Sequence, residues 1–292
     1  MMAVADRARP GLVYLLVGVV GAGSFLYPFW LPHRSLPFQA HAGDAPLVAA
    51  LVGALAVAAV VLEVRRGTMN GATVALLGVL GATAGLLRLL DLPGGGSGIF
   101  FVIVLAGAAF GARFGLLLGL VAMATSAVIT GGIGPWLPFQ MLALAWMGAG
   151  AGAVGRVTKR LGRRTEVAVL AFYGWCWGFV YGAVMNLWFW PFAVDMGDLS
   201  WAPGIGLVET LHRYWSFYVV TSFGWDAAGA LANAALIALT GAALLPSFRR
   251  FAVRLQPAVE LYDVSESAGS ARSPSTCPAP SSSRSPAGSS PS

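Results

Sequence analysis

Charged residues are scarce in this chain of 292 residues. Asp, Glu, Lys and Arg together make up 10% of it, hydrophobic residues make up 57%, and the mean hydropathy is +0.74. An ordinary soluble domain carries about a quarter charged residues. The composition therefore excludes a water-soluble globular protein and predicts an all-α, polytopic membrane bundle. In such a protein a basic isoelectric point marks the cytoplasmic side of the membrane and does not indicate binding to nucleic acid.

Cysteine, histidine and lysine are also rare. The two cysteines, Cys176 in an apolar run and Cys277 in a polar tail, cannot build a disulfide framework. All three histidines fall in expected outer loops without further ligands at metal-binding spacing, so no metal site is expected. The sole lysine, Lys159, lies outside any Gly-x-x-x-x-Gly-Lys-[Ser/Thr] motif, so the chain is not expected to hydrolyse ATP by itself.

Apolar runs of the length that a spanning helix needs, roughly 20 residues, recur along the chain. We predict eight spans, at about 11–31, 45–64, 71–90, 98–112, 114–130, 137–155, 167–190 and 216–246. The fourth and fifth form one stretch that is too long for a single helix. We expect a tight turn at Gly111-Ala-Arg113 to divide this stretch into two short helices.

The positions of the basic residues support this number of spans. With the N-terminus inside, thirteen Lys and Arg residues fall on cytoplasmic segments, and three, Arg34, Arg88 and Arg213, fall on the outer side. This is the asymmetry that the positive-inside rule expects. We therefore expect a multi-pass protein of the cell (plasma) membrane with both termini in the cytoplasm. The last residues, 265–292, are mostly Ser, Pro, Ala and Gly and have nothing to bury, so we expect a disordered tail.

Small residues recur at helical spacing on the third and sixth spans. They are Gly71/Ala75, Gly78/Ala82 and Gly81/Gly85 on the third, and Gly148, Gly150, Gly152 and Gly155 on the sixth. Small residues let helix backbones approach closely in lipid. They indicate either packing within the bundle or a smooth surface for a partner membrane subunit.

Polar residues mark the outer halves of the last three spans. Gln140 begins the sixth span, and Asn186 lies near the end of the seventh. On the last span, residues recur at steps of three and four and are expected to share one helix face: Trp215, Tyr218, Ser222, Asp226, Gly229 and Asn233. An ionised carboxylate within a span costs about 2.5–3.5 kcal/mol on insertion scales. Asp226 is therefore either the floor of an outward-facing, aromatic-lined pocket or one half of an interhelical hydrogen bond.

Five short motifs follow one another along the chain. They are Pro93-Gly-Gly-Gly, Phe110-Gly-Ala-Arg-Phe-Gly115, Gly132-Ile-Gly-Pro-Trp-Leu-Pro-Phe-Gln140-Met, Met185-Asn-Leu-Trp-Phe-Trp190 and Trp225-Asp226. In their order and topology these motifs resemble the substrate-binding S components of energy-coupling factor (ECF) transporters. The resemblance covers about residues 70–250.

The resemblance implies a six-helix substrate-binding membrane core over 70–250. The sequence departs from the family pattern in two additional transmembrane helices, expected in 1–69, and in a cytoplasmic, disordered Ser/Pro-rich tail, expected in 251–292. Such a protein binds a vitamin-class micronutrient, with cobalamin-like ligands among the candidates, on the extracytoplasmic side. It joins a membrane T component and two ABC-type ATPases. The expected substrate-binding residues are Trp136, Gln140, Asn186, Trp215, Tyr218, Ser222 and Asp226. The residues expected to contact the T component are Gly71, Ala75, Gly78 and Ala82. No catalytic residue and no cofactor are expected.

Three other functions are alternatives. An ion-coupled carrier should carry several ionisable residues within the membrane and commonly has inverted repeats, whereas Asp226 is nearly alone here. An integral membrane enzyme could use Asp195 and Asp198 for metal–phosphate chemistry, but there is no second acidic cluster. A structural scaffold would explain the small residues but not the polar face of the last span.

Overall fold

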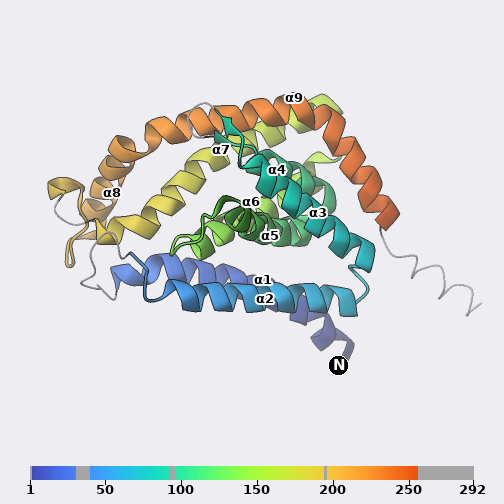
Figure 1. The fold of residues 1–292 in the computed structure, drawn as a ribbon, viewed down its shortest axis with the longest axis horizontal. Coiled ribbons are helices and arrows are strands. Elements are labelled where there is room, and N and C mark those ends of the chain that lie inside the picture. The colour runs from blue at the N-terminus through green and yellow to red at the C-terminus, as the bar shows by residue number, and fades with distance from the viewer. Residues whose placement is uncertain (1, 31–39, 93–95, 194–195, 256–292) are drawn as a thin grey trace, which may run out of the picture. The chain divides into compact units, whose positions relative to one another are not determined.

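The computed structural model describes residues 2–30, 40–92, 96–193 and 196–255, and within these ranges the chain forms nine α-helices (Figure 1). Six helices are long and apolar enough to cross a membrane. They are α1 (Met2–Leu26), α2 (Ala45–Arg65), α5 (Ala112–Thr130), α6 (Leu137–Thr158), α7 (Arg163–Phe189) and α9 (Phe223–Leu255). By length and hydropathy the chain is therefore a multi-pass membrane protein, as predicted.

Six of the eight predicted spans are thus confirmed, and the other two are shorter apolar helices. These are α3 (Gly71–Leu87) and α4 (Ile99–Phe110). The predicted turn between the fourth and fifth spans is also confirmed, and it consists of the single residue Gly111 between α4 and α5. Gly111 has a φ of 98°, which a residue with a Cβ rarely adopts, so glycine is what allows the chain to reverse within one residue.

The predicted eighth span, 216–246, is wrong in its limits. The chain forms two helices there, α8 (Leu207–Thr221) and α9, and Ser222 lies between them with φ −132° and ψ −29°. The helix α9 then continues past residue 246 to Leu255, so residues 251–255 are helical. The tail expected beyond them, from residue 256 onward, lies outside the described residues.

The long helices lie in layers (Figure 1). Helices α1 and α2 lie side by side along one face, α5 and α6 cross in the middle, and α7 and α9 lie along the opposite face. Helix α4 contacts α3, α5, α6, α7 and α9, and nine of its twelve residues are buried. The two N-terminal helices pack against α6 and belong to the same compact unit as the rest of residues 1–256. The boundary between 1–69 and 70–250 stays a prediction.

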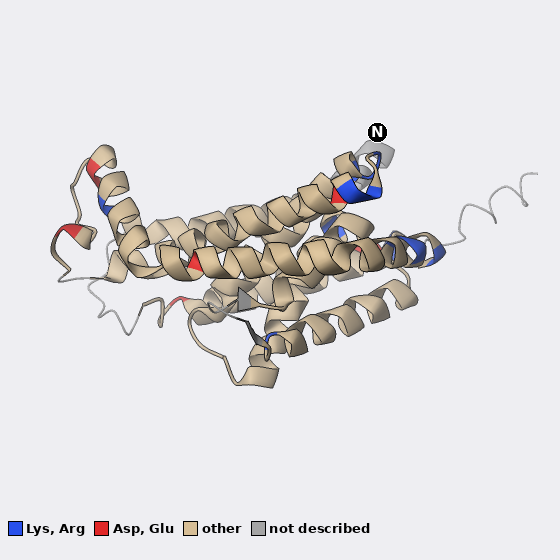
Figure 2. Ribbon diagram, turned by 90° about the horizontal axis from the view of Figure 1, so that it is seen from above, with Lys and Arg blue, Asp and Glu red and all other residues tan. Residues whose placement is uncertain are grey.

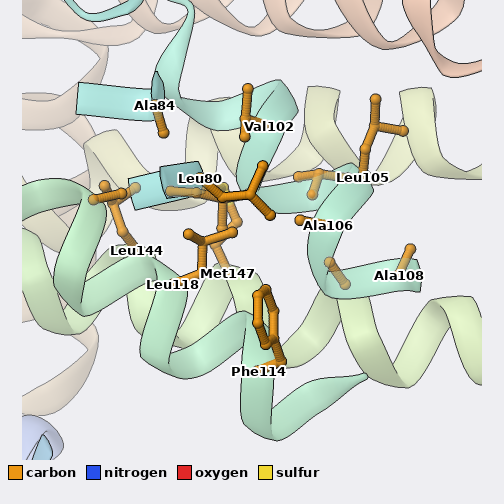
Figure 3. Close-up of a cluster of buried hydrophobic side chains, with 14 of the residues drawn as sticks. Leu80, Ala84, Val102, Leu105, Ala106, Ala108, Phe114, Leu118, Leu144 and Met147 are labelled. Carbon is orange, nitrogen blue, oxygen red and sulfur yellow. The ribbon is translucent and has the colours of Figure 1, made fainter. Parts of the chain in front are cut away.

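The core is built where α3, α4, α5 and α6 meet (Figure 3). It contains the apolar side chains Leu80, Val102, Leu105, Leu118 and Met147, all of which are buried. Glycines bring the backbones of α5 and α6 into contact at the centre of this cluster. A Cβ added at Gly148 would lie closer than 3.0 Å to the carbonyl group of Gly115. Three of the four small residues predicted on the sixth span, Gly148, Gly152 and Gly155, therefore serve packing within the bundle.

The small residues of α3 fall into two groups. Gly81 and Gly85 pack against Val121 and Ser126 of α5. Gly71, Ala75 and Gly78 are exposed and Ala82 is partly exposed, and a Cβ at Gly71 or Gly78 would meet no atom within 4 Å. These four residues follow one another at steps of three and four, so α3 presents a smooth stripe outward. We call this surface the α3 stripe.

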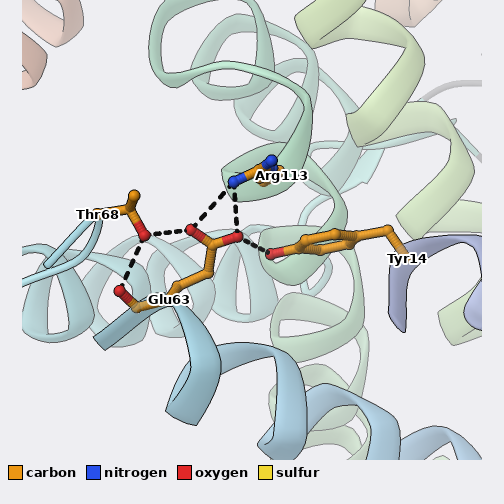
Figure 4. Close-up of polar contacts among 4 residues, drawn as sticks. All are labelled: Tyr14, Glu63, Thr68 and Arg113. Atoms are coloured by element: carbon orange, nitrogen blue, oxygen red, sulfur yellow. Dashed lines mark hydrogen bonds and ion pairs between the residues drawn. The ribbon is translucent and has the colours of Figure 1, made fainter. Parts of the chain in front are cut away.

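Basic residues gather at one end of the bundle, where α1 begins and α9 ends (Figure 2). The sequence analysis did not identify two buried glutamates at this end, and each of them pairs with an arginine. Glu63 of α2 accepts hydrogen bonds from Tyr14, Thr68 and Arg113, and thereby joins α1, α2 and α5 (Figure 4). The Arg113 Nη1–Glu63 Oε1 distance is 3.1 Å, and Glu63 is 2% exposed.

The second buried glutamate, Glu166 of α7, pairs with Arg249 of α9. It also accepts a hydrogen bond from Thr158 at the end of α6, so this ion pair joins the three helices. Both glutamates lie at helix ends that the sequence placed in the cytoplasm. Their charges are compensated by arginines, which is the usual condition for a carboxylate to be buried.

We expect Glu63→Gln to lower the free energy of unfolding in detergent by about 1–2 kcal/mol, since hydrogen bonds to a charged group contribute about 1.5–3 kcal/mol and Arg113 is half exposed. The matched control is Glu209→Gln, which removes the exposed ion pair with Arg213 on α8. That change should leave the free energy of unfolding unchanged, because a solvent-exposed ion pair contributes little to stability. Equal effects of the two substitutions would contradict a structural role for the Glu63 cluster.

Candidate functional site

A cavity of about 390 Å³ lies between the helices and is lined by the first half of α9, so it lies away from the basic end, where α9 terminates. Its walls come from the C-terminal end of α3, the first turn of α4, α5, the first half of α6, the second half of α7 and the first half of α9. The polar lining residues are Arg88, Ser97, Gln140, Tyr181, Asp226 and Asn233. The apolar ones include Ile99, Phe100, Met123, Leu144 and Trp225. We call this space the outer cavity.

The shortness of α4 positions the outer cavity. Twelve residues of helix span about 18 Å, whereas the hydrocarbon core of a bilayer is about 30 Å thick. The chain before α4 is a small hairpin, in which β1 (Asp91–Leu92) pairs antiparallel with β2 (Gly96–Ser97). Residues 93–95 of the predicted glycine-rich loop lie outside the described residues. Because α4 begins deep in the bundle, the longer helices around it enclose a space above its first turn.

Asp226 lies in the first turn of α9 and lines the outer cavity. Its carboxyl group lies directly against Gly182 of α7, where a Cβ would overlap with the Asp226 oxygens. Gly178, one turn earlier, allows a similarly close approach of Ala230. Glycines of α7 thus let α9 approach closely enough to hold the carboxylate at the cavity wall.

Three side chains that line the outer cavity contain a buried oxygen with no hydrogen-bond partner in the described part of the chain. These atoms are Gln140 Oε1, Asp226 Oδ2 and Asn233 Oδ1. Asn233 is itself only 1% exposed. In folded proteins about nine in ten buried polar groups are paired. The lining is therefore suited to a polar occupant that supplies the missing hydrogen bonds.

Arg88, at the C-terminal end of α3, brings a positive charge to the same cavity. Its guanidinium group donates to Met123 Sδ at 3.2 Å, and among the described side chains it makes no ion pair with Asp226. Asp91 follows Arg88 by three residues, a spacing at which an ion pair can form on a helix, and its side chain lies outside the described part of the chain. A cation and a carboxylate thus line one cavity without contacting each other.

Aromatic rings form one corner of the outer cavity. Phe100 of α4 and Tyr181 of α7 pack edge to face, with ring centroids 5.1 Å apart and an interplanar angle of 67°. Trp225 lines the cavity as well and is 70% exposed, so it lies at the rim. Flat molecules pack favourably against such rings.

The other predicted substrate-binding residues do not line the outer cavity. Trp136 is 40% exposed and donates to the Gly132 carbonyl oxygen, at 3.3 Å, and Trp215 is 59% exposed on α8. Asn186 and Ser222 are hydrogen-bonded to each other, at 2.7 and 3.1 Å, and so join α7 to the α8–α9 junction. Tyr218 is buried behind Asp226, close enough to interact with its carboxyl group.

The continuous helix on which Trp215, Tyr218, Ser222 and Asp226 were predicted to share one face is interrupted in the structure. The periodicity assumed a continuous helix, but the helix ends at Thr221 and a new one starts at Phe223. At this break the side chain of Asn186 hydrogen-bonds to Ser222. A residue of α7 that is distant in sequence therefore contacts the junction between α8 and α9. Backbone hydrogen bonds still cross the break, from Ser222 N–H to the Tyr218 carbonyl oxygen and from Asp226 N–H to the Ser222 carbonyl oxygen, both at 2.9 Å.

Sequence reasoning missed Phe100 and Tyr181 as cavity residues, since both lie inside apolar runs. It also left His41 without a role. The His41 ring is buried among Phe139, Trp188 and Phe192, and its Nδ1 atom lies 2.8 Å from Asp44 Oδ2. Partial burial acts to raise the pKa of Asp44, but the hydrogen bond and charge of His41 outweigh it and lower that pKa.

Comparisons with protein-family models, with curated proteins and with solved structures gave no match to this chain.

Proposed function

We propose that this protein is the substrate-specific membrane subunit of an ECF-type micronutrient importer. It binds its ligand in the outer cavity on the extracytoplasmic side, and the energy for transport comes from partner ATPases. The observation that carries the proposal is the outer cavity itself, in which polar side chains with unsatisfied oxygens line a hollow within a helical membrane bundle. Small-molecule sites are concave and mostly apolar with a few converging polar groups, and they commonly lie between the helices of a bundle.

The charge distribution supports the sidedness of this proposal. Most of the described Lys and Arg residues gather at the end where α1 begins and α9 ends (Figure 2), and the exceptions are Arg88, in the outer cavity, and Arg213, on α8. Basic residues mark the cytoplasmic side of membrane proteins. The outer cavity then lies toward the extracytoplasmic side, from which an importer takes up its ligand.

The α3 stripe is the surface that we assign to the partner T component. Two membrane helices associate through small residues that let their backbones approach, and the stripe offers Gly71, Ala75, Gly78 and Ala82 without any cover from the chain itself. The two N-terminal helices lie on the α5–α6 layer and leave the stripe open.

The size of the outer cavity bears on the ligand. Small-molecule sites have volumes of about 300–1,000 Å³, so about 390 Å³ is near the lower limit. This volume favours a compact vitamin-class ligand over a cobalamin-like one, because a macrocycle with an appended nucleotide would require the walls to move apart.

Purification and uptake measurements test the proposal. Mass spectrometry of the full chain purified in detergent should identify a co-purifying small molecule, and cells should accumulate that molecule only when the T component and the ATPases are also produced. Accumulation in a strain that lacks all such ATPases would favour an ion-coupled carrier instead. Absence of any bound small molecule would contradict a substrate-binding role.

Gly78→Leu tests the partner surface. Because a side chain at Gly78 meets no atom of the chain, the variant should fold and bind small molecules like the wild type. It should reduce co-purification of the T component by at least about tenfold, since a branched side chain keeps the two backbones apart. Thr83→Ala, an exposed position of α3 about 100° around the helix from Ala82 and so outside the stripe, is the matched control and should leave complex formation unchanged.

A further inference from the structure

We infer that the occupant of the outer cavity is a small zwitterion that carries one ring, with its acidic group bound at Arg88 and its basic, hydrogen-donating group bound at Asp226. The inference rests on the proposed function only in taking the outer cavity as the ligand site. It narrows the ligand from a vitamin-class nutrient in general to a molecule with two opposite charges.

The first argument is the separation of two opposite charges within one cavity. Arg88 and Asp226 both line it, and no ion pair joins them. Ionised side chains within a membrane bundle normally pair with one another, because an isolated charge there is costly. A ligand with an anionic and a cationic group satisfies both side chains at once, whereas a singly charged ligand leaves one of them without an ionic partner among the described side chains.

The second argument is the chemistry around each charge. Near Asp226 the lining offers oxygens of Gln140 and Asn233 that have no hydrogen-bond partner. Such acceptors are satisfied by N–H groups, as an ammonium or an aminated heterocycle would supply. The acidic group has a second positive feature available besides Arg88. The first turn of α4 begins at the cavity wall, and the hydroxyl group of Ser97, which accepts a hydrogen bond from the Ile99 N–H at 3.4 Å, also lines the cavity.

The third argument concerns the body of the ligand. The edge-to-face pair of Phe100 and Tyr181 forms an apolar wall, with Met123 and Leu144 as further apolar lining. At roughly 30 Å³ per water-sized group, about 390 Å³ holds roughly a dozen non-hydrogen atoms. One ring with two short charged substituents has this size.

Three sets of compounds test the charge requirement with the full chain in detergent. Each set keeps one ring skeleton and contains the zwitterion, the amine alone and the acid alone. One set is phenylalanine, 2-phenylethylamine and 3-phenylpropionate. The second is tryptophan, tryptamine and indole-3-propionate, and the third is the corresponding set of pyridine compounds. Binding is measured as the shift in thermal unfolding temperature with ligand concentration.

We expect that in at least one set the zwitterion binds at least tenfold more tightly than either singly charged analogue. In Arg88→Met this preference over the amine should fall to less than threefold, and in Asp226→Asn the preference over the acid should fall likewise. Trp215→Phe, which changes an exposed ring on α8, should keep the full preference. Circular dichroism and gel filtration show whether each variant is folded, and Arg88→Lys, which keeps the charge, should retain part of the preference.

Two results would overturn the inference. One is a singly charged analogue that binds as tightly as its zwitterion, and the other is the failure of every compound in the three sets to bind. Neither result decides the proposed function, because the ATPase dependence of uptake is measured separately with the co-purifying molecule. Conversely, a zwitterion that binds as expected but is accumulated without the ATPases would overturn the importer and leave the ligand class intact.

Discussion

Asp226→Ala is expected to weaken binding of the co-purifying small molecule about a hundredfold. A hydrogen bond to a charged group contributes about 1.5–3 kcal/mol, and every 1.4 kcal/mol corresponds to a tenfold change in affinity. The variant should still insert and fold, because the carboxyl group has no ion-pair partner among the described residues and lies against Gly182 rather than inside the apolar core. Equilibrium dialysis of the purified variant with the isolated molecule measures the loss. Gln140→Ala should weaken binding as well, by about tenfold, because it removes a neutral hydrogen-bonding group.

Trp215→Ala is the matched control for this experiment. The sequence grouped Trp215 with Asp226, but the structure places Trp215 on α8 with 59% of its surface exposed. Its removal should leave the affinity within about twofold of the wild type. If Trp215→Ala weakened binding as much as Asp226→Ala, the ligand would have to bind along α8 and not in the outer cavity.

Gly148→Ala is expected to destabilise the folded protein by at least about 3 kcal/mol. Overpacking in a core costs typically about 1–3 kcal/mol and occasionally more. Here the added methyl group would meet the backbone of Gly115, which cannot move aside as a flexible side chain can. The helices α5 and α6 would have to separate, and with them the core shown in Figure 3. Unfolding in increasing concentrations of a denaturing detergent, followed by circular dichroism, measures the change.

Gly78→Ala provides the comparison for Gly148→Ala. Both substitutions add one methyl group to a helical glycine, and in a helix interior alanine is favoured over glycine by roughly 0.5–1 kcal/mol. At Gly78 the methyl group meets no atom of the chain within 4 Å, so the isolated protein should be as stable as the wild type or slightly more stable. A loss at Gly78 similar to that at Gly148 would show that helix propensity, and not the α5–α6 contact, determines the effect.

Much of the fold follows from local properties of the sequence. Apolar runs of sufficient length predicted the six long helices, because the thickness of a bilayer sets the length of a spanning helix. Gly111 marked the turn between α4 and α5, because a reversal within one residue requires a positive φ. Asp226 and Gln140 were identified as candidate site residues because charged and amide side chains are rare in such runs. In each case the signal lies within about 20 consecutive residues.

The arrangement of the site depends on contacts between distant segments. No proline or charged residue adjacent to Ser222 marks the helix break in the sequence. The residue that hydrogen-bonds to Ser222, Asn186, lies 36 residues earlier. Arg88 and Tyr181 line the cavity with Asp226 only because α3, α7 and α9 meet above the first turn of α4. The sequence does not distinguish packed glycines from exposed ones. Gly148 packs against the backbone of Gly115, whereas a Cβ at Gly78 would meet no atom of the chain within 4 Å.

The sequence by itself thus determined that the chain is a helical membrane protein, which segments are helical, and that Asp226 is out of place in an apolar span. Hydropathy and backbone conformation are properties of neighbouring residues, so they can be read in order along the chain. Only the tertiary structure decided which residues surround Asp226, which glycines are covered and where α8 ends. These depend on side chains that the chain brings together from far apart, and periodicity within one helix carries no information about them.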